Sequence, residues 1–178
     1  MKHIQILSDD VASQIAAGEV IERPSSVVKE LVENSIDAGA TQISVRILEA
    51  GKDLIEVTDN GKGIPFEELE LAVMRHATSK LQTANDLFNI ETLGFRGEAL
   101  ASIASVSHFN LVSKHEAEII GGKIVNLDGK TFTKSKIGCP DGTTVTIQNL
   151  FYNVPARLKF LKSDITEKQR ISTLVTKF

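Results

Sequence analysis

Three polar residues at helical spacing are the first candidates for chemistry in this sequence. Glu30, Asn34 and Asp37 lie in the stretch 27–38, and Pro24 just before it is a helix start signal. Their i, i+4, i+7 spacing places them within an arc of about 60° on one edge of a helix, beside its apolar half. The expected apolar half comprises Val27, Val28, Leu31, Val32, Ser35, Ile36 and Ala38, and the polar half comprises Lys29, Glu30, Glu33, Asn34 and Asp37. A carboxylate in that position could act as a general base, and an amide oxygen could bind a hard cation.

The same pattern also fits a helix face that simply meets water, as most polar helix faces do. A functional site therefore needs partners elsewhere, and three clusters offer them, each of them weak evidence alone. Asp59 ends an expected strand before the glycine-rich turn 59–65, where a carboxylate can accept a hydrogen bond from an amine such as that of adenine. The run 94–98 lies at a helix start, whose free N–H groups attract phosphate. Thr143 opens a strand after a glycine.

The elements that would position these clusters follow from the periodicity of the apolar residues. The expected order of helices and strands, given below, lacks the regular β-α-β alternation of a doubly wound fold. It predicts a layered α/β sandwich with helices on one face of a mixed, mostly antiparallel sheet. Helices are expected over 8–17, 27–38, 66–76 and 98–106 and after Pro155, a loop over 76–91, and strands over 43–48, 54–57, 109–113 and 143–147, with two more between 114 and 136.

Composition narrows the class of protein. The 178 residues, 42% of them hydrophobic and 24% charged, suit one soluble globular domain. A net charge of -3, no Trp and one Tyr argue against a basic, base-stacking nucleic-acid module. The single Cys139 excludes an internal disulfide and a cysteine zinc site. With no signal peptide and no run long enough to span a membrane, we expect a cytoplasmic protein, or a nuclear one in a eukaryote.

Several familiar motifs are absent, and one segment has an uneven charge. The sequence has no P-loop, no dinucleotide-binding glycine fingerprint and no nucleophile-elbow motif, and its four histidines lack metal-ligand spacing. The segment 155–178 carries six basic residues and two acidic ones. This segment could face a polyanion such as duplex DNA through the edge 157–177, or it could be a solvated helix.

Taken together, the clusters resemble the ATP-binding domain shared by type II topoisomerases, Hsp90-type chaperones, sensor histidine kinases and MutL. Among these, the motifs match the MutL family of DNA mismatch-repair proteins. They occur in that family's order and cover most of the chain, whereas residues 114–136 add little. The matching runs are QIAAGEVIERP (14–24), KELVENSIDAGA (29–40), DNGKGI (59–64), RHATSK (75–80), GFRGEAL (94–100), GTT (142–144) and FYNVPAR (151–157).

The resemblance implies a Bergerat-type ATP-binding fold and a role for each motif. Glu30 would be the general base for the attacking water, and Asn34 would supply an oxygen to the Mg²⁺ that bridges the ATP phosphates. Asp59 would bind the adenine amine, with Thr143 beside it through a bound water. The other nucleotide-binding residues it implies are Asp37 and Ala38 on the helix, Gly61, Gly63 and Ile64 in the wall around adenine and ribose, and Thr78, Ser79, Lys80, Gly94, Phe95, Arg96, Gly97, Glu98, Ala99 and Leu100 in a lid over the phosphates.

These roles imply a Mg²⁺-dependent ATPase, the N-terminal domain of a mismatch-repair protein. In this family ATP drives homodimerisation of a clamp that links mismatch recognition by a MutS-type partner to strand removal and meets DNA through the longer protein. The family also has a second subdomain, whose lysine contacts the γ-phosphate and corresponds to no residue here. We therefore expect residues 1–178 to be an ATP-binding domain cut before or within that subdomain and weak in turnover. The alternative is a nucleotide-gated interaction module that does not hydrolyse ATP.

Overall fold

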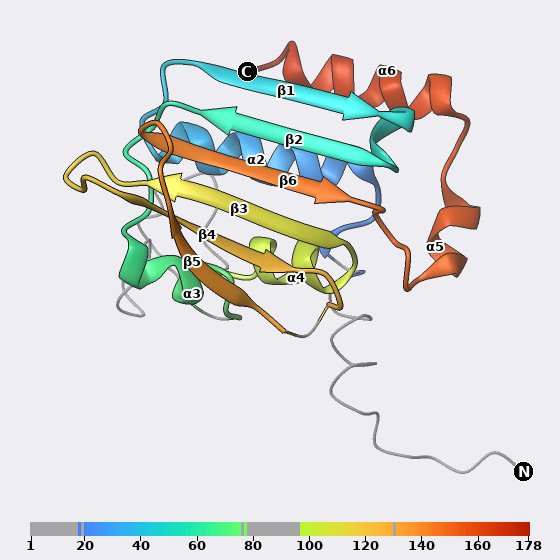
Figure 1. The fold of residues 1–178 in the computed structure, drawn as a ribbon. Coiled ribbons are helices and arrows are strands. Elements are labelled where there is room, and N and C mark those ends of the chain that lie inside the picture. The colour runs from blue at the N-terminus through green and yellow to red at the C-terminus, as the bar shows by residue number, and fades with distance from the viewer. Residues whose placement is uncertain (1–17, 19, 76, 78–96, 130) are drawn as a thin grey trace, which may run out of the picture.

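The computed structural model describes residues 18, 20–75, 77, 97–129 and 131–178. These residues form a six-stranded sheet in the order β1-β2-β6-β3-β4-β5 (Figure 1). Every pairing between the described strands is antiparallel, so the predicted antiparallel character is confirmed and no parallel pair occurs in this part of the chain. The strands are β1 (Ile43–Leu48), β2 (Leu54–Asp59), β3 (His108–Lys114), β4 (Gly121–Asn126), β5 (Thr133–Ile137) and β6 (Gly142–Gln148).

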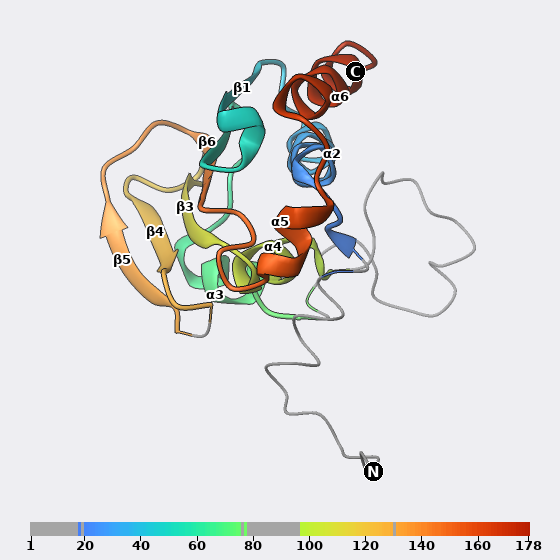
Figure 2. The ribbon, with the colours of Figure 1, turned by 90° about the vertical axis from the view of Figure 1, so that its right-hand side faces the viewer.

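The described helices cover one face of this sheet, as the sequence predicted. Figure 2 shows α2, α4 and α6 on the same side of the strands, with the opposite face free of helices. The longest described helix, α2, packs against β2 and α6. The helical elements are α2 (Pro24–Asp37), the 3₁₀ turns η1 (Glu49–Gly51) and η2 (Phe66–Glu68), α3 (Leu69–Ala72), α4 (Ala99–Ser105), α5 (Pro155–Phe160) and α6 (Asp164–Val175).

The ends of α2 follow from its local sequence. Arg23 is extended, and Pro24 occupies the first helical position, where a missing N–H costs no hydrogen bond. The helix thus begins three residues before the predicted stretch 27–38. At the other end Gly39 takes a left-handed φ of 75°, and its N–H donates to the carbonyl of Ile36 at 2.9 Å. The predicted stop at this glycine is confirmed.

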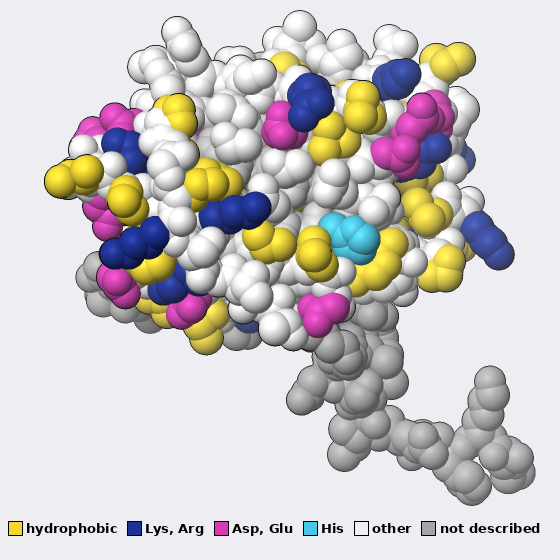
Figure 3. All heavy atoms as spheres, viewed as in Figure 1, with side chains coloured by type: hydrophobic (Ala, Val, Ile, Leu, Met, Phe, Trp, Pro, Cys, Tyr) yellow, Lys and Arg dark blue, Asp and Glu magenta, His cyan; other side chains and the backbone are white. Residues whose placement is uncertain are grey.

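The core lies between α2 and the helix-facing side of the sheet. Val28 and Leu31 of α2 are buried with Ile55 of β2 and with Phe109 and Leu111 of β3. Along β1 and β3 burial alternates residue by residue, because successive side chains of a strand point to opposite faces. The uncovered face carries the more exposed members of each strand, and Figure 3 shows hydrophobic side chains scattered there among polar and charged ones.

Three local predictions were wrong. The helix expected over 66–76 is a 3₁₀ turn followed by the four-residue α3, since Leu71 and Met74 are exposed and no apolar stripe continues beyond Val73. On α2, Glu33 was placed on the polar half but is only 7% exposed. Its carboxylate lies 3.0 Å from the ammonium of Lys29 one turn earlier, so the buried charge is paired. Ile36, expected in the apolar half, is exposed.

Candidate functional site

The carboxylate of Asp59, at the last position of β2, is the centre of the candidate site. Asp59 pairs with Thr143 of β6 in the sheet register. Its Oδ1 accepts the backbone N–H of Gly61 at 2.9 Å and that of Thr143 at 3.3 Å. Its Oδ2 accepts the hydroxyl of Ser35 at 2.8 Å. Donors from α2, from the following turn and from β6 therefore hold this half-buried carboxylate in one orientation.

Ser35 is a site residue that sequence reasoning missed. It was assigned to the apolar half of α2, and it is indeed only 3% exposed. Its hydroxyl also lies 3.1 Å from the carbonyl oxygen of Leu31 one turn earlier, so the proton can go to either Leu31 or Asp59. The available signal was a single hydroxyl in an otherwise apolar helix face, because a buried hydroxyl needs a hydrogen-bond partner.

Ser113 of β3 is a second missed residue, and it ties the glycine-rich turn to the sheet. Its hydroxyl accepts the N–H of Ile64 at 2.8 Å and lies 3.0 Å from the carbonyl oxygen of Gly142. The same hydroxyl is 2.8 Å from that of Thr143. Thr143 thus contacts Asp59 through its backbone N–H and Ser113 through its side chain.

The turn after Asp59 packs directly on the end of α2. The N–H of Lys62 donates to the carbonyl of Ala38 at 3.0 Å. A Cβ at Gly61 would lie 2.9 Å from both the carbonyl oxygen and the Cβ of Ala38, so no larger residue fits there without a shift. Gly63 has a φ of 69°, and a Cβ on it would collide with the carbonyl of Lys114. Both glycines therefore allow the turn to pack closely against Ala38 and Lys114, while their contact with a ligand stays a prediction.

Glu30, Asn34 and Asp37 lie on the helix that reaches this centre. All three are half-buried, and the side chain of Glu30 is 26% exposed. On a regular helix Asn34 lies about 40° from Ala38, with Glu30 one turn further from the turn that Ala38 contacts. The face of α2 that carries these three residues is therefore partly covered and not fully open to solvent. Their catalytic and metal-binding roles stay predictions.

The predicted lid falls mostly outside the described residues. Gly97 takes a left-handed φ of 61°, and Glu98 precedes the seven-residue α4, which begins at Ala99. Among the described contacts, residues 97–100 make none of the hydrogen bonds that orient Asp59. Their roles stay predictions. The lid residues outside the described part are Thr78, Ser79, Lys80, Gly94, Phe95 and Arg96.

The described residues limit other chemistries. They contain no group of three or more His, Cys, Asp or Glu side chains that could hold a metal ion. Burial raises the pKa of the Cys139 thiol, which lowers the fraction of nucleophilic thiolate. None of the helices in this part of the chain is both long and apolar enough to cross a membrane.

The basic segment near the C-terminal end is partly committed to the fold. The guanidinium of Arg157 donates to the carbonyl of Ile21 at 2.9 Å and lies over the ring of Phe151. The other five basic residues of this segment are exposed: Lys159, Lys162, Lys168, Arg170 and Lys177. A surface that faces a polyanion and a solvated helix both stay predictions for this segment.

Comparison with known families shows which family this chain belongs to. Residues 21–138 match the family described as histidine kinase-, DNA gyrase B- and HSP90-like ATPases. The matched range includes α2, Asp59 and the glycine-rich turn. The chain belongs to this ATPase family. The α/β sandwich and the ATP-binding fold predicted from the sequence are confirmed by this match and by the structures below.

Within this ATPase family the chain is similar to MutL, as its motifs indicated. It is 51% identical to the DNA mismatch repair protein MutL of Symbiobacterium thermophilum over 99% of this chain and 28% of that protein. It is 52% identical to MutL of Acidobacterium capsulatum over 100% of this chain and 27% of that protein. The chain thus spans little more than a quarter of the length of these relatives.

Solved structures agree with this placement in the ATPase family. The Aquifex aeolicus MutL ATPase domain complexed with ADP is 40% identical, with a TM-score of 0.71 over 88% of this chain and 54% of that chain. The N-terminal domain of a DNA repair protein is 34% identical, with a TM-score of 0.72 over 93% of this chain and 46% of that chain. The first match confirms the fold of a MutL-type ATPase domain, and the second supports the same fold.

The hydrogen bonds of Asp59 give a prediction for stability. Asp59→Ala should lower the free energy of unfolding by about 1–3 kcal/mol, because the N–H groups of Gly61 and Thr143 lose their acceptor. Asp59→Asn is the matched control: its amide oxygen can accept both N–H groups, and the Ser35 hydroxyl can donate to Leu31 instead. We expect this variant to lie within about 1 kcal/mol of the original. Urea unfolding followed by circular dichroism measures both, and equal losses would contradict the hydrogen-bond assignment.

Proposed function

We propose that this chain forms the nucleotide site of a Mg²⁺-dependent, MutL-type ATPase, in which ATP binding and hydrolysis drive a dimeric clamp in DNA mismatch repair. One observation carries the proposal. The carboxylate of Asp59 is fixed by three donors at a strand end, beside a glycine-rich turn and the helix that bears Glu30 and Asn34. The ADP complex of the similar Aquifex aeolicus domain supports an adenine nucleotide as the ligand.

The chemistry of Asp59 explains why the base would be adenine. A carboxylate has about four acceptor sites, and here three donors use three of them. The remaining lone pair can accept the exocyclic amine of adenine. Guanine presents a carbonyl oxygen at the same ring position, and an acceptor facing an acceptor is repelled. The site therefore selects ATP and ADP over their guanine counterparts.

The donor set on α2 fits Mg²⁺. This ion is commonly held by one or two protein oxygens together with substrate phosphates and several waters, so a cluster of protein ligands is not required. Asn34 offers one amide oxygen from a half-buried position. When bound there, Mg²⁺ would neutralise charge on the phosphates. The protein's part is to hold that amide on a rigid helix.

Glu30 would do the acid–base work. It lies one helical turn before Asn34, so the two groups face the same side of α2. Its carboxylate would orient a water molecule for attack on the terminal phosphate and accept its proton. Phosphoryl transfer depends mainly on positioning and charge neutralisation, which suits a site made of one base and one cation-holding amide.

The activity of the whole protein goes beyond these residues. We propose a homodimer formed on ATP binding, a MutS-type partner and DNA contacts through the longer protein, in keeping with the relatives named DNA mismatch repair protein MutL. The residues here act as its N-terminal ATP-binding domain, in a protein of the cytoplasm or nucleus. By themselves they would bind nucleotide and turn it over slowly, since the second-subdomain lysine expected in this family corresponds to none of them.

Asp59→Asn tests the proposal directly. The amide replaces the remaining acceptor by a partial donor, so ADP affinity should fall by about 5- to 150-fold, equivalent to about 1–3 kcal/mol. Titration calorimetry with ADP and GDP measures the change. Wild-type protein should bind ADP far more tightly than GDP, and the variant should lose this preference. Unchanged ADP affinity in a folded variant would remove Asp59 from base recognition.

Glu30→Ala tests the catalytic role. In the full-length protein we expect turnover to fall by about 10²- to 10⁴-fold while ADP affinity is kept, because the base acts on water and not on the adenine. Steady-state phosphate release gives the rate. Glu56→Ala is the control, since Glu56 pairs with Arg46 on the uncovered face of the sheet. Normal turnover in Glu30→Ala would exclude Glu30 as the base.

Asn34→Ala tests the metal. Affinity for ATP should fall more in the presence of Mg²⁺ than in excess chelator, because only the metal complex uses the amide oxygen. Paired titrations with a non-hydrolysable ATP analogue, with and without Mg²⁺, measure the two affinities. Equal losses under both conditions would argue that Asn34 contacts the nucleotide itself or supports the fold.

A further inference from the structure

The segment that leads into α2 is held by the two C-terminal helices. The guanidinium of Arg157, on α5, donates to the carbonyl of Ile21 at 2.9 Å. A Cβ added at Gly18 would collide with the same guanidinium, so this group sits directly against the backbone of the segment. Arg157 also lies over the ring of Phe151, which is fully buried, so its position is fixed from below.

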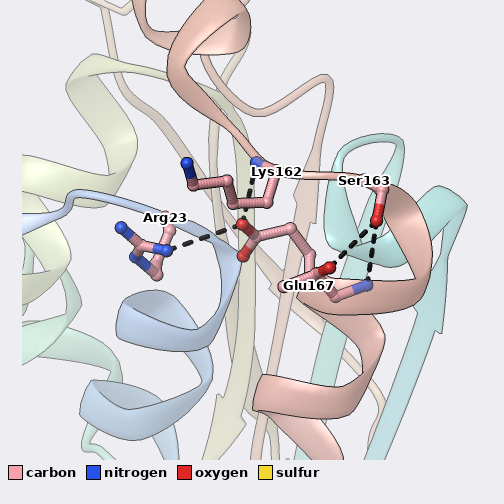
Figure 4. A network of polar contacts seen from close by, with 5 residues as sticks. Arg23, Lys162, Ser163 and Glu167 are labelled. Atoms are coloured by element: carbon pink, nitrogen blue, oxygen red, sulfur yellow. Dashed lines mark hydrogen bonds and ion pairs between the residues drawn. The ribbon is translucent and has the colours of Figure 1, made fainter.

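A second contact reaches Arg23, the residue just before the helix. Figure 4 shows Glu167 of α6 between Arg23 and the backbone of Lys162. The Glu167 side chain is 1% exposed, and its Oε1 lies 3.5 Å from Nη1 of Arg23 and accepts the N–H of Lys162 at 3.1 Å. Arg23 is the N-cap residue of α2. One buried carboxylate thus joins the start of α6 to the start of α2.

The ion pair between Arg23 and Glu167 leaves some hydrogen-bonding atoms without partners in the described part of the chain. Among the described residues, neither Nη1 of Arg23 nor Oε2 of Glu167 has a hydrogen-bond partner. A bidentate pair would use both carboxylate oxygens and hold one geometry tightly. This one ion-pair contact is therefore the described polar link between α6 and Arg23, and removing the charge of Glu167 removes the link.

The position of α2 matters because its other end is fixed at the nucleotide site. Ser35 donates to Asp59, and Ala38 accepts from Lys62 in the glycine-rich turn. Glu30 lies between the two anchors, seven residues after Arg23, or about 10 Å along the helix axis. A movement at the N-terminal anchor therefore displaces Glu30 far more than it displaces Ser35.

We propose that Glu167 and Arg157 are positioning residues, which set the start of α2 and thereby the place of Glu30 relative to the nucleotide. Through them the helices α5 and α6 govern turnover while base recognition at Asp59 is left unchanged. This inference rests on the proposed ATPase function, because it concerns the placement of the same catalytic carboxylate.

The test compares two carboxylates of one helix. Glu167→Gln keeps the shape and the acceptor for Lys162 but removes the charge that faces Arg23. Asp164→Asn makes the same change in charge three residues earlier. The Asp164 carboxylate lies 2.9 Å from the ammonium of Lys52, beside η1, so its ion-pair partner is not part of α2. This partner raises the pKa of Lys52, so the control also removes a real ion pair.

In the full-length protein, Glu167→Gln should lower kcat for ATP about tenfold or more, since an error of about 1 Å in a catalytic group can cost 10²-fold. ADP affinity should stay within about threefold, because Asp59 keeps its donors. Amide exchange along α2 should become faster near Arg23. For Asp164→Asn we expect kcat within about twofold of the wild-type value, because a solvent-exposed ion pair contributes little energy and this one does not involve α2.

A second variant guards against a folding defect. Arg157→Met keeps an unbranched side chain over Phe151 but removes the donor to Ile21, and it should lower kcat in the same selective way. An unchanged kcat in folded Glu167→Gln, or an equal fall of kcat in Asp164→Asn, overturns the inference. So does a loss of ADP affinity that parallels the loss of kcat, or a urea unfolding curve showing that neither test variant is folded. Failure of the proposed function would look different, because the wild-type protein would then neither bind ADP nor hydrolyse ATP.

Discussion

A carboxylate at the end of a buried strand needs donors, and Asp59 draws them from three separate parts of the fold. Ser35 comes from the helix layer, Gly61 from the turn and Thr143 from the neighbouring strand. Leaving such a group unpaired while half-buried would cost several kcal/mol, on the order of a domain's whole stability margin. Satisfying it fixes how α2 lies on the sheet, and the rest of the candidate site inherits its geometry from that arrangement.

The layers explain why one helix can carry so much of the chemistry. The apolar half of α2 is buried against β2, so the helix cannot rotate without exposing residues such as Val28 and Leu31. Its polar edge then has a fixed direction relative to the sheet. Side chains on a rigid, well-packed element are held more precisely than side chains on a loop. The arrangement is therefore suited to a base and an amide that must meet the same phosphate.

Local sequence signals predicted the elements well but not their cross-connections. The start and stop of α2, the alternation in β1 and β3 and the strand-end position of Asp59 all depend on neighbours within a few residues. Ser35 and Asp59 are 24 residues apart, and Arg157 and Ile21 are 136 apart. No periodicity encodes such pairs, because they arise only when distant elements pack. The helix expected over 66–76 failed for a related reason: tertiary packing buries Leu69 and Val73 but leaves Leu71 and Met74 exposed.

The register of β2 against β6 has a consequence for how the protein is made. Thr143 meets Asp59 across a separation of 84 residues, and Thr146 meets Glu56 across 90. Closing so long a loop is entropically unfavourable until both strands are present, so this central pairing forms late. On the ribosome, which extends a chain by about 5–20 residues each second, β1 and β2 would emerge several seconds before β6. During that interval the edge of β2 that later pairs with β6 is uncovered, and chaperones or neighbouring nascent chains have time to reach it.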